Sequence, residues 1–325
     1  MKDKSKRLVS IVTPCFNEEA NVEQCHDEVR RIFEEELPDY DFEHIFVDNN
    51  SNDGTMRILR KMAKKDLRVK VISNSRNIGP FRSMWNGLKN SSGHLVIPFV
   101  PADLQDPPAV IPKLIAEFSR GNLVVYGIRA KRIESWYMKF ARKFYYILIH
   151  KLSGSEIPLN AGEFLLADRR IIDSILEIDD EYPYIRGLIA LTGAKSSFVE
   201  YTWEKRAKGV SKNNFISLID QAVNGLLSTS RIPARFALLF GIVFSFISII
   251  SAVILLLLFV FNPTRPAMGI PTLIVSGLFL SGAQLFFLGV VGEYVLSIHS
   301  QVRKRPKAFD VERINFRKEK SVNRE

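Results

Sequence analysis

The last third of the sequence has almost no charge. No residue is charged between Arg235 and Arg265, and none between Arg265 and Glu293. A helix needs about 20 apolar residues to cross the hydrocarbon core of a membrane. The two runs therefore exclude an ordinary soluble surface and predict two transmembrane helices, at about 236–261 and 271–297. The alternative, a pair of buried core helices, fits two consecutive uncharged runs less well.

Cysteine is also scarce. The chain of 325 residues has two, Cys15 and Cys25, and their spacing matches no set of metal ligands. This excludes a disulfide framework and a cysteine-based zinc site, so we expect two free thiols. Internal repeats and low-complexity segments are absent as well. The first residues, MKDKSKR, lead directly into a strand-like run, and we expect no signal peptide.

Positive charge gathers beside the uncharged runs. The net charge is +10, and the segment from Arg303 onward holds nine basic and four acidic residues, a net of +5. Cations there favour anionic lipid headgroups by about 1 kcal/mol each, which argues against nucleic acid as a partner. Arg231 and Arg235 precede the first run, whereas the loop between the runs carries only Arg265. Positively charged flanks stay in the cytosol, so we expect both termini there, including a basic tail over 301–325.

Strand-like and helix-like patterns alternate through the first 130 residues. Helices are expected from Val22 to Glu36 and from Thr55 onward. This alternation predicts an α/β domain with a mostly parallel, doubly wound sheet. Ligands of such sheets bind beyond the carboxyl ends of the strands. The runs that predict strands are LVSIVTPCF, FEHIFVD, VKVISN, HLVIPFV and VVYGIR.

Two further stretches allow two interpretations. Aromatic residues mix with lysine and arginine over 135–152, and apolar residues recur at helical spacing over 215–227. Either both stretches pack into a core, or they lie in the membrane interface with cations toward the headgroups. Their closeness to the uncharged runs favours the interface, with 214–232 as an amphipathic juxtamembrane helix.

Four polar loops follow the expected strands: TPCFNEE, VDNNSNDGT, NSRNIGP and ADLQDPP. In this order, and followed by two uncharged runs, they resemble the inverting family-2 glycosyltransferases with a nucleotide-sugar-binding GT-A fold. The most similar branch contains dolichol-phosphate mannose synthases and bacterial polyprenyl-phosphate glucosyl and aminoarabinosyl transferases. The resemblance spans nearly the whole chain. It implies a cytosolic GT-A catalytic domain over 1–213 and two transmembrane helices over 233–300.

The first three loops are expected to hold the donor nucleotide. Asp48 ends a strand, where a carboxylate can accept the N–H of a pyrimidine base or a ribose hydroxyl. Asp53 has two interpretations, because it can cap the helix that starts at Thr55 or support the site. Gly79 would let the backbone approach the donor closely, unless it is an ordinary turn glycine. The resemblance assigns six residues to the donor nucleotide: Pro14, Asn17, Glu18, Asp48, Asn77 and Gly79.

The fourth loop is expected to hold a divalent cation. A nucleotide diphosphate leaving group carries charge, which Mg²⁺ or Mn²⁺ with hard oxygen ligands stabilises as a Lewis acid. By resemblance, Asp103 supplies the metal carboxylate and Gln105 a second oxygen. Asp106, which precedes two prolines, has the alternative of belonging only to a turn.

The sequence departs from the family pattern at three places. The metal motif, usually Asp-x-Asp, reads PAD at 101–103, and the acidic pair after the second strand reads DN, with Asn49 as its second member. A segment that is often Gly-Asp-Phe reads GEF, which keeps a carboxylate at Glu163 on a longer arm. Either the chain belongs to a subgroup with shifted donor choice, which we favour, or it is an impaired enzyme.

The acceptor site needs positive charge more than a strong base. A polyprenyl phosphate is itself the nucleophile, so groups that hold it near the anomeric carbon suffice. The segment WEKRAKGVSK resembles the family's Arg-x-x-Gly-x-Ser-Lys loop, which is associated with phosphate binding. Glu163 is the remaining carboxylate for orienting the acceptor or assisting as a base. The expected catalytic residues are Asp103, Glu163, Arg206 and Lys212, and Arg129, Arg132 and Ser211 are expected to contact phosphates or the acceptor. For Arg129 and Arg132 a solvated surface position is an equal alternative.

These patterns predict transfer of one sugar from a nucleotide sugar, with a UDP-sugar favoured, to undecaprenyl or another polyprenyl phosphate. The multi-pass protein is expected in a bacterial plasma membrane, with its catalytic domain in the cytosol. A homo-oligomer, in particular a tetramer, is implied by the resemblance alone. Two alternatives stay open: a non-catalytic membrane scaffold that retains the fold, and a transferase that acts on a soluble or diacylglycerol acceptor.

Overall fold

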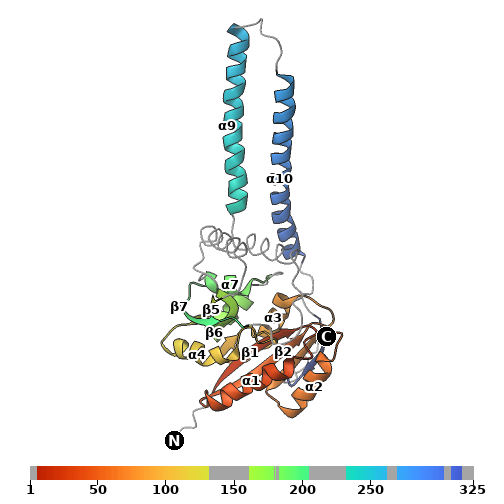
Figure 1. Ribbon diagram of the computed structural model, residues 1–325, viewed down its shortest axis with the longest axis vertical. Helices are drawn as coiled ribbons and strands as arrows, with labels where there is room; N and C mark the ends of the chain where they lie inside the picture. The colour runs from red at the N-terminus through yellow and green to blue at the C-terminus, as the bar shows by residue number, and fades with distance from the viewer. Residues whose placement is uncertain are drawn as a thin grey trace, which may run out of the picture. The chain divides into compact units, whose positions relative to one another are not determined.

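The computed structural model describes residues 6–131, 161–178, 180, 183–204, 232–261, 269–303 and 309–316. The chain forms two compact units (Figure 1). One unit contains the α/β part together with the segment 305–325, and the other contains two long helices within 219–304.

Eight strands form the sheet of the first unit within the described residues: β1 (Arg7–Cys15), β2 (Tyr40–Asp48), β3 (Val69–Asn74), β4 (Leu95–Ile97), β5 (Val124–Lys131), β6 (Ala161–Asp168), β7 (Ser196–Thr202) and β8 (Asp310–Ile314). Their order is β7-β5-β6-β4-β1-β2-β3-β8. The series β4-β1-β2-β3 is parallel, as is β5 with β7, whereas β6 and β8 run antiparallel to their neighbours. The predicted α/β class with a mostly parallel sheet is confirmed.

The central strands are buried because helices cover them on both sides. In β2 the seven consecutive residues from Phe42 to Asp48 are buried, as expected for a strand without a solvent face. Ile11 and Val12 of β1 belong to two different core clusters. Because successive side chains of a strand point to opposite faces, these clusters lie on opposite faces of the sheet, which makes the fold doubly wound.

Helices of the first unit divide between these two faces (Figure 1). The helices, including one 3₁₀ turn, are α1 (Val22–Glu35), α2 (Thr55–Lys65), α3 (Pro80–Lys89), η1 (Pro108–Val110), α4 (Ile111–Ser119), α6 (Arg169–Leu176) and α7 (Ile185–Leu191). Side chains of α1 and α4 pack in the cluster that contains Ile11. Those of α3, α6 and α7 pack in the cluster that contains Val12.

The second unit contains α9 (Ile232–Phe261) and α10 (Ile270–Val302), which contact each other. Many large apolar side chains on both helices are exposed, among them Leu285, and a contiguous surface of this kind marks contact with lipid or protein. Among the described residues, one helix is long and apolar enough to cross a membrane, over Phe279–Leu296 of α10, and a shorter apolar stretch, Leu239–Ser251, lies in α9. The two-span hairpin therefore stays a prediction.

The end of the chain differs from the sequence expectation. After α10 the chain returns to the first unit and adds β8 antiparallel to β3, within the segment expected to be a basic tail. The five residues of β8 are flanked by cations. Such a pattern indicates a solvated segment, so the sequence does not predict the strand. The patterns also do not predict β6 and β7. The stretch 135–152 and nearly all of 214–232, expected at the membrane interface, lie outside the described residues.

Candidate active site

The polar loops leave the sheet at one edge, beyond the carboxyl ends of β1, β2 and β4. Cys15 and Asp48 end β1 and β2 and are paired in register, and Pro14 precedes Cys15 in the same ladder. The chain that leaves β4 stays beside β1, because the N–H of Val100 donates to the carbonyl of Val12 at 2.9 Å. The loops after these three strands therefore start side by side, where parallel sheets bind their ligands.

The loops after β1 and β2 are joined by hydrogen bonds. Asn17 adopts a left-handed backbone with φ of 55°, which asparagine tolerates better than most residues. Its N–H donates to Ser51 Oγ at 2.9 Å, and its Oδ1 accepts the N–H of Asn52 at 2.8 Å. The N–H of Glu18 donates to Thr55 Oγ1 at 2.9 Å. Asn17 and Glu18 thus help to set the shape of the loop that follows Asp48.

Asp53 accepts hydrogen bonds both at the start of α2, whose N-cap residue is Gly54, and from the loop after β1. Its Oδ1 accepts the N–H of Thr55 at 2.9 Å at the start of α2, and its Oδ2 accepts the N–H of Glu19 at 3.3 Å. Burial opposes ionisation of this carboxyl, but the hydrogen bonds from Thr55 and Glu19 outweigh it and lower the pKa. Asp53 therefore stabilises the helix start and holds the loop after β1.

Asp48 is buried, at 1% exposure, and only partly hydrogen-bonded. Its Oδ2 accepts the N–H of Ser51 at 3.2 Å, whereas Oδ1 has no hydrogen-bond partner among the described residues. Burial raises the pKa of this carboxyl. A buried acceptor without a donor costs free energy, and an N–H or hydroxyl of a ligand would supply the missing bond. The position fits an acceptor for a base or ribose.

The loop after β4 is strained where it carries the predicted metal ligands. Leu104 has φ of 60°, which is unusual for a bulky residue and of a kind that clusters at functional sites. Asp103, on one side of it, accepts the N–H of Gln105 at 3.2 Å. The carbonyl of Gln105 accepts the N–H of Glu204, beyond β7, at 3.0 Å. These bonds hold the loop in one shape.

Asp103 and Gln105 offer the oxygen donors that a hard cation takes. The described part of the chain contains no group of three or more His, Cys, Asp or Glu residues that could hold a metal. Magnesium-type ions that act on nucleotides use one or two carboxylates and complete their shell from phosphates and water. The residues therefore fit a divalent ion that binds together with a diphosphate, and Pro101 contributes no ligand.

Asp106 belongs to a buried ion pair and lies in a bend of the loop. It is 1% exposed, and it accepts from Nε and Nη2 of Arg129 at 2.8 and 2.6 Å and from the hydroxyl of Tyr201 at 2.5 Å. The guanidinium of Arg129 also lies 5.6 Å from the ring centre of Trp203. A bidentate pair fixes the plane of a guanidinium, so Arg129 is held in one orientation. Its expected contact with phosphate stays a prediction.

Glu163 lies on β6 beside a cation that the sequence analysis did not single out. Nε of Arg186 lies 3.8 Å from Oε1 of Glu163 and 3.0 Å from the hydroxyl of Tyr184. Oε2 of Glu163 has no hydrogen-bond partner among the described residues. Burial raises the pKa of Glu163 in spite of the nearby guanidinium. A carboxyl with a raised pKa and an open oxygen fits an orienting or proton-accepting role, which stays a prediction.

The loop between β3 and α3 carries Asn77 and Gly79. Gly79 has φ of 85°, a conformation that favours glycine, and its N–H donates to Asn77 Oδ1 at 2.9 Å. A Cβ added at Gly79 would meet no atom within 4 Å. Open space therefore lies beside this backbone, as a close approach by a ligand requires. The other predicted site residues, Arg132, Arg206, Ser211 and Lys212, lie outside the described residues.

Comparison with known proteins identifies the family. The sequence model of the family described as Glycosyl transferase family 2 matches residues 10–176. The chain belongs to glycosyltransferase family 2. The SfII prophage-derived bactoprenol glucosyl transferase of Shigella flexneri is 35% identical over 302 residues, which cover 92% of this chain and 96% of the relative. YkcC, an uncharacterized glycosyltransferase of Bacillus subtilis strain 168, is 32% identical over 298 residues, 91% of each chain.

A solved structure supports the fold of this glycosyltransferase. The crystal structure of a mycobacterial protein matches with a TM-score of 0.51 and 22% identity, covering 69% of this chain and 74% of that one. At this level of identity the likeness concerns the fold alone.

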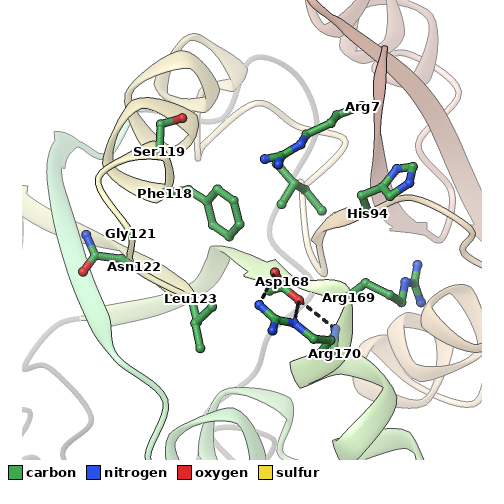
Figure 2. A pocket seen from close by; sticks show the side chains of 11 residues that line it. Arg7, His94, Phe118, Ser119, Gly121, Asn122, Leu123, Asp168, Arg169 and Arg170 are labelled. Atoms are coloured by element: carbon green, nitrogen blue, oxygen red, sulfur yellow. Dashed lines mark hydrogen bonds and ion pairs between the residues drawn. The ribbon is translucent and has the colours of Figure 1, made fainter. Parts of the chain in front are cut away.

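Figure 2 shows a pocket of the glycosyltransferase that none of the polar loops described above lines. Its volume is about 480 Å³, and its lining includes Arg7 at the start of β1 and Asp168 at the end of β6. Arg170 is held by Asp168 at 2.9 Å, and Arg169 donates to the carbonyl of Gly93 at 2.8 Å. Because two of its three arginines already bind protein groups, and because it opens at the opposite ends of the central strands, we do not assign the donor to this pocket.

Long-range contacts account for what the sequence analysis missed in this glycosyltransferase. Tyr201 and Asp106 are far apart in the chain, and no local pattern marks their contact. Arg186 did leave a signal, because it is the single charged residue in the otherwise apolar helix α7.

Proposed function

We propose that this glycosyltransferase moves one sugar, with inversion, from a UDP-sugar to a polyprenyl phosphate at the cytosolic face of a bacterial plasma membrane. The observation that carries the proposal is the presence, in one chain, of a carboxylate-lined sheet edge and of long helices with exposed apolar side chains. A soluble acceptor would not require such helices. The alignment with the bactoprenol glucosyl transferase covers 92% of this chain, which supports a lipid phosphate as acceptor.

The donor is proposed to bind through Asp48. Its Oδ1, unpaired among the described residues, suits the N3–H of uracil or a ribose hydroxyl, and Gly79 leaves room beside its backbone. Because several of the relatives are glucosyl transferases, UDP-glucose is the first donor to test.

The chemistry proposed is a single displacement. An oxygen of the lipid phosphate attacks the anomeric carbon, the bond from that carbon to the β-phosphate oxygen breaks, and UDP leaves with the electron pair. A divalent ion held by Asp103 and Gln105 would stabilise the charge on the leaving diphosphate. Arg206 and Lys212 are proposed to hold the acceptor phosphate, and Glu163 to orient it.

The proposal is tested by measuring UDP release from the detergent-solubilised full chain. The panel would contain UDP-glucose, UDP-galactose, UDP-N-acetylglucosamine and GDP-mannose, with or without undecaprenyl phosphate, and with Mg²⁺, Mn²⁺ or EDTA. We expect release from a UDP-sugar that requires both the lipid phosphate and a metal, together with a glycosylated lipid in the organic phase.

Other outcomes of this assay would support the alternatives. Equal rates with a neutral lipid alcohol would indicate another acceptor class. Nucleotide binding without turnover of any donor would indicate a scaffold. Release that requires the lipid phosphate but is unaffected by EDTA would refute the assignment of Asp103 and Gln105 to a metal.

A further inference from the structure

Asn49, which stands where the family usually has a second aspartate, lies inside a polar network beneath the donor loop. It is 3% exposed. Its Oδ1 accepts from the Ser83 hydroxyl at 2.5 Å, from Nδ2 of Asn74 at 3.1 Å and from the N–H of Ile78 at 3.4 Å. Its Nδ2 donates to the carbonyl of Gly79 at 3.3 Å. One side chain thus holds both Ile78 and Gly79, on the loop between β3 and α3.

The network continues from Asn49 to the strand that follows α10. Nδ2 of Asn86 donates to Oδ1 of Asn74 at 3.0 Å and to Oδ1 of Asp310 at 2.7 Å. Asp310 is the first residue of β8, 224 positions from Asn86. This amide network consists of Asn49, Asn74, Ser83, Asn86 and Asp310.

The network explains why an amide suits position 49. A carboxylate accepts hydrogen bonds only, so an aspartate here could not donate to the carbonyl of Gly79 and would face that oxygen with negative charge. An amide provides one acceptor and two donors in the same volume. In a buried site, each unpaired polar group would cost free energy. Asn49 therefore matches the groups around it, and its replacement of aspartate does not by itself indicate a decayed site.

We propose that the amide network positions the loop after β3 for the donor, so that β8 is a structural part of the donor site. The inference rests on the proposed function, because it takes Asn77 and Gly79 as donor contacts. The bond that Asp310 accepts from Nδ2 of Asn86 orients the Asn86 amide, which orients Asn74 and, through it, Asn49. The residues act as positioning residues, since no described contact places them against the reacting atoms.

Strand β8 also forms an ion pair that does not belong to the amide network, and a variant of this ion pair serves as a matched control. Glu312, also in β8, pairs with Arg60 of α2 at 2.7 Å. Replacing Glu312 by alanine removes a polar anchor of β8 and leaves the Asp310–Asn86 bond in place. Replacing Asp310 by alanine removes that bond together with the ion pair between Asp310 and Arg313, whereas Asp310→Asn weakens the ion pair but keeps an oxygen that can accept from Asn86.

The experiment measures the dissociation constant of UDP by calorimetry on the full chain in detergent, and then KM for UDP-glucose and for undecaprenyl phosphate. Asp310→Ala is expected to raise the UDP dissociation constant and the UDP-glucose KM about fivefold, the value of one hydrogen bond. The KM for the lipid should stay within about twofold, because none of the residues proposed to hold the acceptor belongs to the network. Asp310→Asn should restore most of the affinity, and Glu312→Ala should leave it unchanged. As a second probe, Asn49→Asp should weaken UDP binding at least as much as Asp310→Ala.

The outcomes separate this inference from the proposed function. If the wild type binds UDP and Asp310→Ala binds it equally well, the positioning role of the network is refuted. The same holds if Glu312→Ala weakens UDP binding as much as Asp310→Ala does. In both cases the donor assignment remains. A wild type that binds no UDP would refute the donor assignment and the inference together. Thermal unfolding of each variant shows whether the chain is folded, and a loss of affinity in a variant with unchanged Tm supports positioning.

Discussion

Strand β2 carries two buried carboxylates five positions apart, and their surroundings are opposite. Glu43, toward the amino end, accepts from the hydroxyl of Ser10 and the N–H of Ser92, each at 2.5 Å, and pairs with Lys70. Asp48, at the carboxyl end, accepts a backbone N–H on one oxygen and has no partner for the other among the described residues. Both belong to the same strand and are almost fully buried.

The pKa values of these carboxyls shift in opposite directions. Burial would raise the pKa of Glu43, but the hydrogen bonds from Lys70, Ser10 and Ser92 outweigh it and lower the pKa. Burial raises the pKa of Asp48, and its few hydrogen bonds do not compensate. Glu43 is therefore stabilised as an anion by the fold, whereas one oxygen of Asp48 has no partner among the described residues, as the proposed donor site requires. In this pair the exposure of the two carboxylates is alike, and the hydrogen bonds that each accepts differ.

The largest expected effect is on catalysis and concerns Asp103, the carboxylate proposed to bind the metal. Asp103→Ala should lower the rate of sugar transfer by roughly 10³-fold, because loss of Lewis-acid stabilisation is worth several kcal/mol. The measurement is kcat for UDP-glucose with saturating Mn²⁺ and undecaprenyl phosphate. A variant that keeps a tenth of the wild-type rate would refute the assignment of Asp103 to a catalytic metal.

Glu43→Gln should destabilise the fold without impairing the site. Removal of the charge leaves Lys70 without its buried partner, at a cost of about 3 kcal/mol, or roughly 9 °C in Tm for a domain of this size. Thermal unfolding measures the loss, and transfer per folded molecule should match the wild type. A loss of activity at unchanged Tm would contradict the structural role.

The contribution of Glu43 should also depend on pH in a defined direction. The folded-state pKa is lowered, so the stabilisation is present above the unfolded pKa and is lost as the pH falls through the folded value. The difference in Tm between wild type and Glu43→Gln should therefore shrink as the pH is lowered below about 4.5. A difference that grows at acid pH would contradict the sign.

Asp48→Asn should weaken donor binding without lowering stability, whereas Glu43→Gln should lower stability without weakening donor binding. Loss of a charged acceptor should weaken UDP binding by about 2 kcal/mol, or about 30-fold. Because the folded-state pKa of Asp48 is raised, ionisation opposes folding as the pH rises through that value. Tm at neutral pH should therefore be equal or higher in the variant. Calorimetry with UDP and thermal unfolding test both halves, and a fall in Tm with unchanged UDP affinity would contradict them.

The smallest expected effect concerns Asp106. It tests whether the role of a carboxylate depends on its position at this edge of the sheet or on its hydrogen-bond partners. Asp106 lies at the active edge but has partners on both oxygens, Arg129 and Tyr201. Tyr201→Phe should lower stability by about 1 kcal/mol, or about 3 °C in Tm, and should leave the UDP dissociation constant unchanged. Weaker UDP binding in this variant would show that even fully bonded carboxylates of this edge serve the donor.

Local patterns were sufficient for the parts of the fold that local physics determines. The apolar runs of β1 to β4, the polar loops after them and the helix start near Asp53 follow from periodicity and capping. The resemblance then placed Asp48 and Asp103 in those loops. What was missed depends on distant contacts, such as Tyr201 with Asp106 and Asn86 with Asp310, because a sequence pattern records neighbours in the chain and not partners across the sheet.

One transfer assay compares the two buried carboxylates of β2 directly. Transfer of labelled glucose from UDP-glucose to undecaprenyl phosphate would be compared in the wild type, Glu43→Gln and Asp48→Asn, at limiting donor and with rates corrected for folded protein. Glycosylated lipid is expected from the wild type and from Glu43→Gln at equal rates, and about 30-fold less from Asp48→Asn. Equal rates from Asp48→Asn and the wild type, or loss of transfer in Glu43→Gln alone, would contradict this expectation.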